Sequence, residues 1–249
     1  WQHSQMMKLA TLSIASATNL KGTYFVVVYE TYKNFQALER LRTTQPHLQV
    51  EKIPDAMVDL CWVVHIELLK YAFLQRQPQG ALCIYVELDQ LFLPGAGLAF
   101  GAAFANSSFD IAYTFNRKRA STFGSVNTGV ILFRASKHVT DWMELMARDT
   151  STLTAPGRCK GGENQKAIDR YVPHLSWGNH SRAKQISILA LPYPGPLNYN
   201  VAGCCNLPSG IFVAHFKSNK KAFALSSCCR DHVQAHADFW LASCTCRRD

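Results

Sequence analysis

Two carboxylates separated by one residue, Glu87 and Asp89, directly follow an apolar run of the chain. The run, residues 81–86, is rich in β-branched and aromatic side chains and predicts a buried strand. Because a buried strand cannot hold bare charges in its middle, we expect both carboxylates at its carboxyl-terminal end, where ligands bind in open α/β sheets. Two such oxygen donors suit a divalent cation, which can neutralise a diphosphate. The segment therefore suggests metal-assisted chemistry on a nucleotide derivative.

Three further segments carry polar side chains at the ends of predicted elements. In residues 126–134, Val-Asn-Thr-Gly-Val-Ile-Leu-Phe-Arg, a small polar and glycine step begins a strand, so backbone and amide can approach a ligand. Residues 161–165, Gly-Gly-Glu-Asn-Gln, turn into a helix N-terminus, which suits hydroxyl or anion recognition. Residues 213–221 end a strand in His215 with lysines just after it, which suits a metal and a phosphate.

The elements that must position these side chains alternate between strands and helices. This alternation favours an α/β fold, a mostly parallel sheet flanked by helices. No G-x-G-x-x-G or G-x-x-x-x-G-K loop occurs, which argues against a conventional dinucleotide fold or a P-loop. In the helix predicted over residues 57–74, apolar side chains such as Trp62, Ile66 and Leu69 mark the expected buried face. The predicted strands are 9–17, 23–29, 50–53, 81–86, 110–115, 126–133, 186–191 and 211–215, and the predicted helices are 34–42, 57–74, 98–104, 137–148 and 163–171.

The composition is that of a globular protein with a basic surface. Of 249 residues, 48% are hydrophobic and 17% charged, which provides a sizeable core. The net charge of +9 favours anionic partners: a phosphorylated substrate, an acidic membrane or nucleic acid. Recognisable nucleic-acid-binding motifs are absent, so no nucleic acid is expected. No apolar run is long enough to span a bilayer, so we expect membrane attachment only through an anchor outside this sequence.

Nine cysteines point to an oxidising compartment. Six lie within the last 50 residues, and disulfides are favoured over zinc because the spacing contains no C-x2-C pair. We expect one domain over residues 1–222 and a Cys-rich tail, residues 223–249, packed on it. Asn106 and Asn179 begin glycosylation acceptor patterns. Together these features favour a glycoprotein of the secretory pathway, in the Golgi or ER lumen.

Taken in order, the four polar segments resemble the motifs of GT-A fold nucleotide-diphospho-sugar transferases. The resemblance is strongest to retaining glycosyltransferase families of the glycogenin-like and plant cell-wall α-xylosyl- or α-galactosyltransferase kinds. Those families carry a D-x-D strand end, an N-[ST/A]-G-[VM] strand, a D-Q or E-Q helix start, an L-P-x-x-x-N segment and a late H-F/Y-x-G-x-x-K motif. The matching segments here are Glu87-x-Asp89, Asn127-Thr128-Gly129-Val130, Glu163-Asn164-Gln165, Leu191-Pro192-x5-Asn198-Tyr199-Asn200 and His215-Phe216-Lys217-Ser218-Asn219-Lys220.

The resemblance implies a role for each matching residue. Glu87, Asp89 and His215 would bind Mn²⁺ or Mg²⁺, and Lys220, with Lys221 as a substitute, would pair with a phosphate oxygen. Lys70 matches a basic residue that faces the donor diphosphate. The implied catalytic residues, which would contact hydroxyls of the donor sugar, are Asn127, Asn164 and Gln165. The other implied donor-binding residues are Ala15, Ser16 and Ala17 on the edge of the first strand under the base, and Leu88, Thr128, Gly129, Glu163, Lys217 and Ser218.

Three positions depart from the family pattern. Glu87 stands where Asp is usual, Asn164 where a carboxylate is frequent, and Ser218 where glycine is usual. Asn164 leaves no obvious nucleophile, which is consistent with a front-face retaining mechanism.

The resemblance implies transfer of a sugar from a nucleoside-diphosphate sugar, typically a UDP-sugar, to a hydroxyl of a glycan or glycoprotein, with retention. Two alternatives stay open. The departures would also suit a catalytically inactive, transferase-like module that binds glycans, and the net charge alone would suit a basic nucleic-acid-binding protein.

Overall fold

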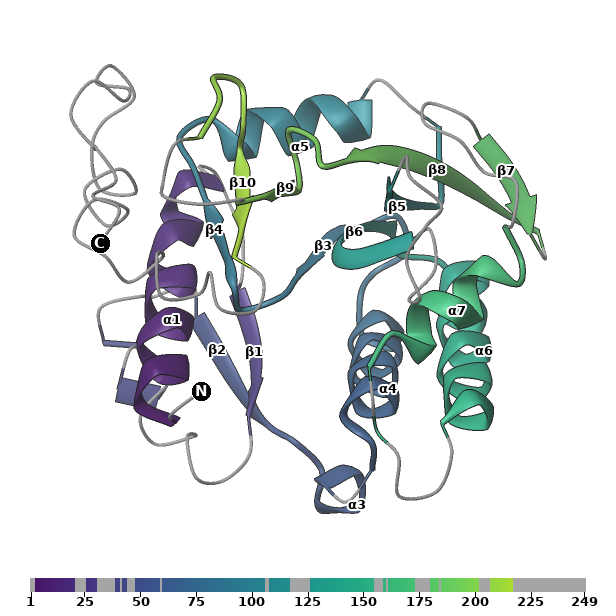
Figure 1. The fold of residues 1–249 in the computed structure, drawn as a ribbon. Helices are drawn as coiled ribbons and strands as arrows, with labels where there is room; N and C mark the ends of the chain where they lie inside the picture. The colour runs from purple at the N-terminus through teal and green to yellow at the C-terminus, as the bar shows by residue number, and fades with distance from the viewer. Residues whose placement is uncertain are drawn as a thin grey trace. The chain divides into compact units, whose positions relative to one another are not determined.

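The computed structural model of the protein divides the chain into two compact units (Figure 1). The first unit comprises Trp1–Lys52, Glu87–Ala103 and Pro194–Asp249, and the second comprises Ile53–Val86 and Phe104–Tyr193. The structure describes residues 3–20, 26–30, 39–40, 42–43, 48–58, 60–105, 108–116, 126–154, 159, 161–172, 180–183, 185–201 and 207–216.

The second unit is built on a five-stranded mixed sheet. Only β5 and β8 pair in parallel, and the other three pairings are antiparallel, so the prediction of a mostly parallel sheet is wrong. Short links explain two of these antiparallel pairings, β5 with β6 and β7 with β8, because a parallel crossover needs about a dozen residues or more and residues 117–125 and 184–185 are fewer. The strands in their order across the sheet are β3 (Leu82–Val86), β6 (Val126–Arg134), β5 (Ile111–Asn116), β8 (Ile186–Tyr193) and β7 (His180–Ala183).

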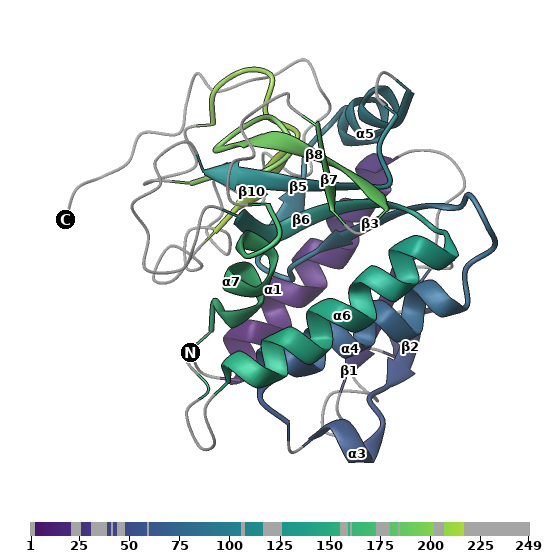
Figure 2. The same ribbon diagram turned by 90° about the vertical axis from the view of Figure 1, so that its right-hand side faces the viewer.

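Three helices, α4 (Trp62–Gln75), α6 (Lys137–Leu153) and α7 (Glu163–Asp169), share one hydrophobic core with this sheet (Figure 2). Helix α6 begins after Ser136, whose hydroxyl accepts the amide hydrogen of Val139 at 3.2 Å as an N-terminal cap. Its buried side chains recur at helical spacing, and Trp142 Nε1 donates to the hydroxyl of the fully buried Tyr113 on β5 at 2.9 Å. The helix is therefore held to the sheet by both packing and a buried hydrogen bond.

Helix α4 buries a different face from the one that its apolar residues predict. The single helix expected over residues 57–74 is two, α3 (Asp55–Val58) and α4, because Cys61 leaves the helical conformation and caps the second. Trp62, on the predicted buried face, is 52% exposed. The residues that α4 buries are Val63, Val64, Glu67, Lys70 and Leu74. Two of them, Glu67 and Lys70, are charged, and they can be buried because each charge pairs with the other.

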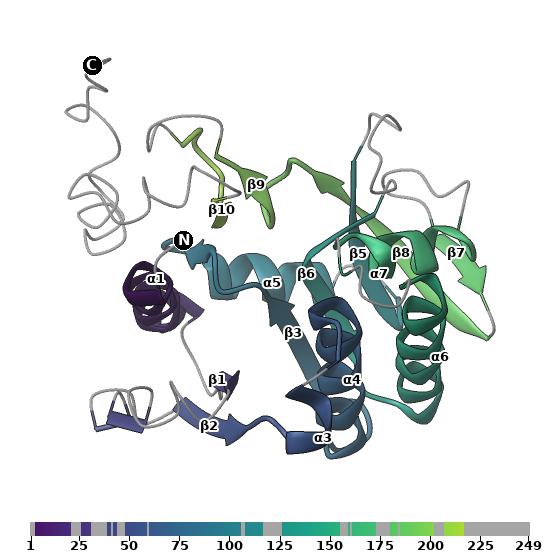
Figure 3. The same ribbon diagram turned by 60° about the horizontal axis from the view of Figure 1, so that its bottom comes forward.

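The first unit contains two small sheets and an N-terminal helix (Figure 3). Strands β1 (Val26–Glu30) and β2 (Leu48–Lys52) pair in parallel. In the second sheet, β10 (Val213–His215) lies between β4 (Gln90–Phe92), to which it is antiparallel, and β9 (Tyr199–Asn200), to which it is parallel.

The strand predicted over residues 9–17 is wrong, because this segment belongs to helix α1 (His3–Ser16), followed by the short 3-10 helix η1 (Ala17–Leu20). Its buried residues recur at helical spacing, at Leu9, Ala10, Ser13, Ile14 and Ala17, which a short apolar run does not reveal. Leu9 packs with β4 and β10 in the core of the first unit.

The remaining predicted elements can be compared where the structure describes them. Those beginning at residues 23, 50, 81, 110, 126, 186 and 211 each contain a strand, and those beginning at 98, 137 and 163 each contain a helix, as expected; α5 spans Ala96–Ala105. Most of the predicted helix 34–42 and the whole tail 223–249 lie outside the described residues. Among the helices that are described, none has the length and apolar character needed to cross a membrane.

Candidate active site

The two carboxylates of the first unit follow a strand end, as predicted. Strand β3 ends at Val86, Glu87 begins the turn, and β4 begins at Gln90. The backbone carbonyl of Glu87 accepts the amide hydrogen of Gln90 at 3.2 Å. The carbonyl of Asp89 accepts the amide hydrogen of Phe216 at 2.9 Å, which ties the turn to the end of β10.

Strand β10 brings a histidine to this turn from far along the chain. Its antiparallel pairing with β4 puts His215 opposite Gln90. The imidazole Nε2 lies 3.3 Å from Asp89 Oδ1 and 3.4 Å from Glu87 Oε2, and the three ligand atoms all lie within 4.8 Å of one another. His215 and Asp89 are buried, whereas the side chain of Glu87 is one-third exposed, at 33%. The triad Glu87, Asp89 and His215 therefore forms one compact cluster.

The orientation of His215 is fixed by Asn198. His215 Nδ1 donates to the side-chain carbonyl of Asn198 at 3.0 Å, and both side chains are fully buried. Because Nδ1 holds the proton in this bond, the lone pair of a neutral imidazole lies on Nε2, the nitrogen that faces the carboxylates. Metal-binding histidines are commonly oriented in this way by a carbonyl on the other ring nitrogen.

The charges of the cluster and its donor atoms both fit a divalent cation. Burial alone lowers the pKa of His215, but hydrogen bonding and charge from Asp89 and Glu87 outweigh it, so the net pKa of His215 is raised. The two carboxylates thus favour positive charge at this point. Ligands at right angles around an ion at about 2.1 Å are about 3 Å apart, close to the two separations seen here. Two carboxylates and one imidazole are ligands that suit Mn²⁺. They also suit Mg²⁺, although Mg²⁺ prefers a site with more oxygen ligands.

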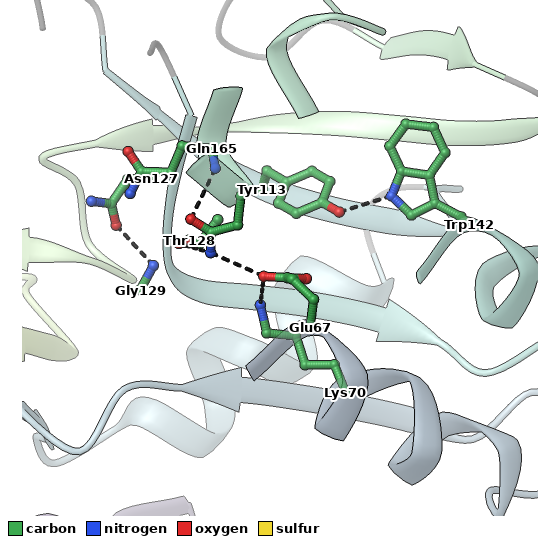
Figure 4. A network of polar contacts seen from close by, with 9 residues as sticks. Glu67, Lys70, Tyr113, Asn127, Thr128, Gly129, Trp142 and Gln165 are labelled. Atoms are coloured by element: carbon green, nitrogen blue, oxygen red, sulfur yellow. Dashed lines mark hydrogen bonds and ion pairs between the residues drawn. The ribbon is translucent and has the colours of Figure 1, made fainter. Parts of the chain in front are cut away.

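A separate polar network lies in the second unit, between α4, α7 and β6 (Figure 4). Glu67 Oε1 accepts from Lys70 Nζ at 2.7 Å and from Asn164 Nδ2 at 2.9 Å. Lys70 Nζ also lies 4.3 Å from the centre of the Tyr85 ring, a cation–π contact. Glu67 is 1% exposed and Lys70 5%, so their charges are balanced in a buried setting.

The predicted Asn-Thr-Gly step on β6 is an irregularity of the sheet. The β5 register jumps from Tyr113 opposite Ile131 to Thr114 opposite Asn127, which bulges β6 at residues 128–130. Asn127 Oδ1 accepts the amide hydrogen of Gly129 at 3.0 Å, and Thr114 Oγ1 donates to the Asn127 backbone carbonyl at 2.8 Å.

The bulge also joins two of the predicted motifs. Thr128 Oγ1 lies 3.4 Å from Asn164 Nδ2, so the structure brings the Asn-Thr-Gly step and the Glu-Asn-Gln helix start together, as the resemblance implies.

The start of α7 is shaped by two glycines and by the residues that begin α4. Gly161 and Gly162 adopt left-handed φ values of 83° and 86°. A Cβ on Gly161 would lie 2.8 Å from the ring of Trp62. The neighbouring Cys61 forms a disulfide with Cys159, which the sequence interpretation, focused on the tail, did not identify.

Several candidate residues can now be placed. Glu163 is buried at the first position of α7, Asn164 Oδ1 accepts the Gln165 amide hydrogen at 2.9 Å, and Leu88 lies within the carboxylate turn. Lys217, Ser218, Lys220 and Lys221 lie outside the described residues.

Ala15, Ser16 and Ala17 end a helix and begin η1 rather than forming a strand edge, so that part of the prediction is wrong. The Ser16 hydroxyl donates to the Ser13 carbonyl at 2.6 Å and accepts from the Phe92 amide at 2.9 Å. It therefore fixes α1 to β4.

Glu67 was missed by the sequence interpretation. A helical-wheel reading could have found it, since Glu67 and Lys70 fall in the row that joins Val63 to Leu74, and an acid–base pair inside an apolar row signals a buried ion pair.

Three solved structures with a similar fold are glycosyltransferases. Mouse xyloside xylosyltransferase 1 is 12% identical with a TM-score of 0.54, and the match covers 87% of this chain and 93% of that one. A glycosyltransferase involved in the glycosylation of the major capsid of PBCV-1 is 13% identical with a TM-score of 0.51, covering 86% and 100%. The glycosyltransferase GlyE of Streptococcus pneumoniae TIGR4 is 9% identical with a TM-score of 0.52, covering 86% and 53%.

No protein-family model and no curated protein matches the amino-acid sequence. The structural likeness therefore shows the fold: a GT-A-like α/β fold with mixed sheets flanked by helices. The resemblance that the motifs indicate is confirmed at this level.

Proposed function

We propose that this protein is a metal-dependent glycosyltransferase that moves a sugar from a nucleoside-diphosphate sugar, typically a UDP-sugar, to a hydroxyl of a glycan or glycoprotein. The observation that carries the proposal is the cluster of Glu87, Asp89 and His215 in the first unit, in a chain with a GT-A-like fold. Neither the fold nor an acidic cluster would suffice alone, since folds host many functions and exposed acidic groups are common.

In the first unit, Glu87, Asp89 and His215 would hold Mn²⁺ or Mg²⁺. The ion would supply Lewis-acid stabilisation of the negative charge that develops on the leaving nucleoside diphosphate. The buried Asp89 and His215 are held by backbone pairing and by Asn198, so they are preorganised as ligands. Glu87 is the more exposed member, and its longer side chain can adjust between the metal and the donor.

In the second unit, Asn127, Asn164 and Gln165 would contact hydroxyls of the donor sugar, and Lys70 would face the diphosphate. An amide at position 164 can donate to or accept from a hydroxyl, but it cannot act as a nucleophile. This supports transfer with retention by a front-face route, in which a phosphate oxygen of the leaving group accepts the proton of the attacking hydroxyl. Lys217, Ser218, Lys220 and Lys221 remain proposed donor ligands from the sequence motif.

The disulfide between Cys61 and Cys159 supports a secretory-pathway location, in the Golgi or ER lumen, because such bonds persist in oxidising compartments. Acceptors there are glycans and glycoproteins, whose hydroxyls fit the proposed reaction.

The experiment is a donor screen that measures UDP release. UDP-glucose, UDP-galactose and UDP-xylose are supplied with simple glycoside acceptors and either Mn²⁺ or EDTA. We expect one donor to be turned over with Mn²⁺ and none with EDTA, and we expect His215→Ala to remove the turnover. Turnover that persists in EDTA would contradict the metal role, whereas glycan binding without metal-dependent binding of any UDP-sugar would favour a glycan-binding module.

A further inference from the structure

The buried carboxylate of Glu67 is not among the residues that the sequence motifs assign, yet it contacts two that they do. A single oxygen, Oε1, accepts from the Lys70 ammonium at 2.7 Å and from the Asn164 amide at 2.9 Å. Lys70 lies one turn along the same helix, α4, whereas Asn164 lies on α7, so the bond to Asn164 links the two helices. Removing the charge of Glu67 would weaken both contacts at once, because an amide oxygen is a poorer acceptor than a carboxylate.

The cost of this arrangement indicates that it does more than hold the fold. Taking an ion pair out of water costs several kcal/mol per ion, and apolar residues of similar volume often serve stability as well or better. Glu67 is 1% exposed and sits in a row otherwise shared with Val63 and Leu74, where an apolar side chain would pack. Its other oxygen, Oε2, is buried and has no hydrogen-bond partner among the described residues. A buried acceptor without a partner calls for an explanation, and a catalytic or binding role is one of the explanations known.

The carboxylate of Glu67 also lies where it could replace the one that the family pattern often has at position 164. Residue 164 is an asparagine where a carboxylate is frequent, and its amide nitrogen points at Glu67. The pair Glu67 and Asn164 therefore presents one carboxylate and one amide beside Lys70, with the carboxylate on α4 instead of α7. The Tyr85 ring lies 4.3 Å from the Lys70 ammonium, as measured to the ring centre.

We propose that Glu67 is a positioning residue of the donor-sugar site, which fixes Lys70 and Asn164 for recognition of a UDP-sugar by supplying the carboxylate from α4. This inference rests on the proposed function. This role differs from a purely structural one, because it needs one carboxylate and one amide beside Lys70 but does not need the carboxylate on α4. Exchanging the two side chains, Glu67→Gln with Asn164→Asp, should therefore preserve the site. Each single variant should weaken donor binding, because Glu67→Gln leaves two amides beside Lys70 and Asn164→Asp leaves two carboxylates within hydrogen-bond distance of each other.

The test measures the affinity for UDP-glucose, UDP-galactose and UDP-xylose in Mn²⁺, by calorimetry, for wild type, Glu67→Gln, Asn164→Asp and the double variant. With the tightest of these donors, we expect each single variant to bind at least about tenfold more weakly, as for the loss of one hydrogen bond to a charged group. The double variant is expected to return to within about threefold of wild type, since residues in one network are strongly coupled. Glu144→Gln, which removes an exposed carboxylate on α6, is the control and should bind like wild type.

The outcomes separate this inference from the proposed function. Single variants that bind like wild type, or a double variant no better than the weaker single, overturn the role of Glu67 while the proposed function stands. If Glu67→Gln and the double variant both fail to fold, as judged by circular dichroism, Glu67 is structural and the proposal is overturned. Wild-type protein that binds none of the donors overturns the proposed function, and the donor role of Glu67 with it.

Discussion

At the scale of single residues, the proposed chemistry depends on how completely each ligand is oriented before a metal arrives. His215 is held by Asn198 on one nitrogen and faces Asp89 and Glu87 with the other. Preorganised ligands lose little conformational entropy on binding, so the support given by Asn198 should be measurable.

Replacing Asn198 by alanine should weaken metal binding without removing a ligand. The imidazole of His215 would lose the bond that fixes its tautomer and ring orientation, and such outer partners are worth about 10- to 100-fold in metal affinity. Titration of Mn²⁺ followed by electron paramagnetic resonance measures the effect, with His215→Ala as the reference for loss of the ligand itself. An Asn198→Ala protein that binds Mn²⁺ like wild type would show that the bond to Asn198 does not matter.

The triad could be predicted residue by residue because each member lies at a recognisable strand end. The sequence shows that Glu87 and Asp89 follow an apolar run and that His215 ends another. Asn198 lies in a quoted motif, but its partner could not be predicted, since the pairing depends on β9 lying beside β10. Glu67 was missed because the expected buried face was drawn through Trp62, Ile66 and Leu69, whereas α4 buries the row from Val63 to Leu74.

At the scale of elements, the start of α7 is fixed by its contact with the start of α4. Gly161 combines a left-handed φ with a close approach to Trp62, and the adjacent Cys61 is bonded to Cys159. The two attached residues, Cys159 and Gly161, are two positions apart in the sequence, and Gly161 lies just before Glu163 and Asn164. We therefore expect substitutions here to affect stability first and the donor residues through it.

Gly161→Ala should destabilise the protein more than Gly80→Ala does. Both glycines have φ of 83°, so both substitutions carry the left-handed penalty of about 1–2 kcal/mol. A Cβ on Gly80 meets no atom within 4 Å, whereas a Cβ on Gly161 meets the Trp62 ring at 2.8 Å, so the half-exposed Trp62 side chain must shift, at a cost below the ~1–3 kcal/mol of overpacking in a closed core. Urea unfolding followed by circular dichroism gives the difference. Equal losses in the two variants would show that Trp62 moves aside at no cost.

Removal of the disulfide should also be costly. The bond between Cys61 and Cys159 closes a loop with a sequence separation of 98, and such bonds typically contribute about 2–4 kcal/mol. The double variant Cys61→Ser/Cys159→Ser should lose this amount of unfolding free energy.

The free thiol of Cys83 should not exchange with this disulfide in the folded protein before unfolding is measured. Burial raises the pKa of the Cys83 thiol to about 11, so it stays protonated and unreactive at neutral pH. Unchanged stability of the double variant would mean that the loop is held closed by packing alone.

At the scale of the whole molecule, the sequence predicts the α/β class and most elements, but not how the strands pair. Local patterns of apolar residues identify strands such as residues 126–133, and the short link before β6 favours its antiparallel pairing with β5, yet nothing local tells β6 to pair with β3. The helix at residues 3–16 was mistaken for a strand, because a short apolar run fits both periods. The order of the motifs along the chain nevertheless indicates a GT-A-like fold, and the similarity to solved structures confirms it.

The positive net charge of the chain is consistent with a negatively charged donor such as a nucleoside-diphosphate sugar. A net charge of +9 raises the local concentration of anionic ligands, and a nucleoside diphosphate is such a ligand. Non-specific attraction of this kind is screened by salt and does not require the triad. A metal-dependent component of binding therefore separates the proposed site from general electrostatics.

The most direct test of the central claim is calorimetric titration of the protein with UDP, in Mn²⁺ and in EDTA, at 0.15 M salt. The Glu87, Asp89 and His215 cluster predicts binding in Mn²⁺ that is lost in EDTA and in Asp89→Asn, while Asp141→Asn, which changes an exposed carboxylate on α6, binds like wild type. UDP binding of equal strength with and without Mn²⁺, or a folded Asp89→Asn protein that binds as wild type does, would contradict the account.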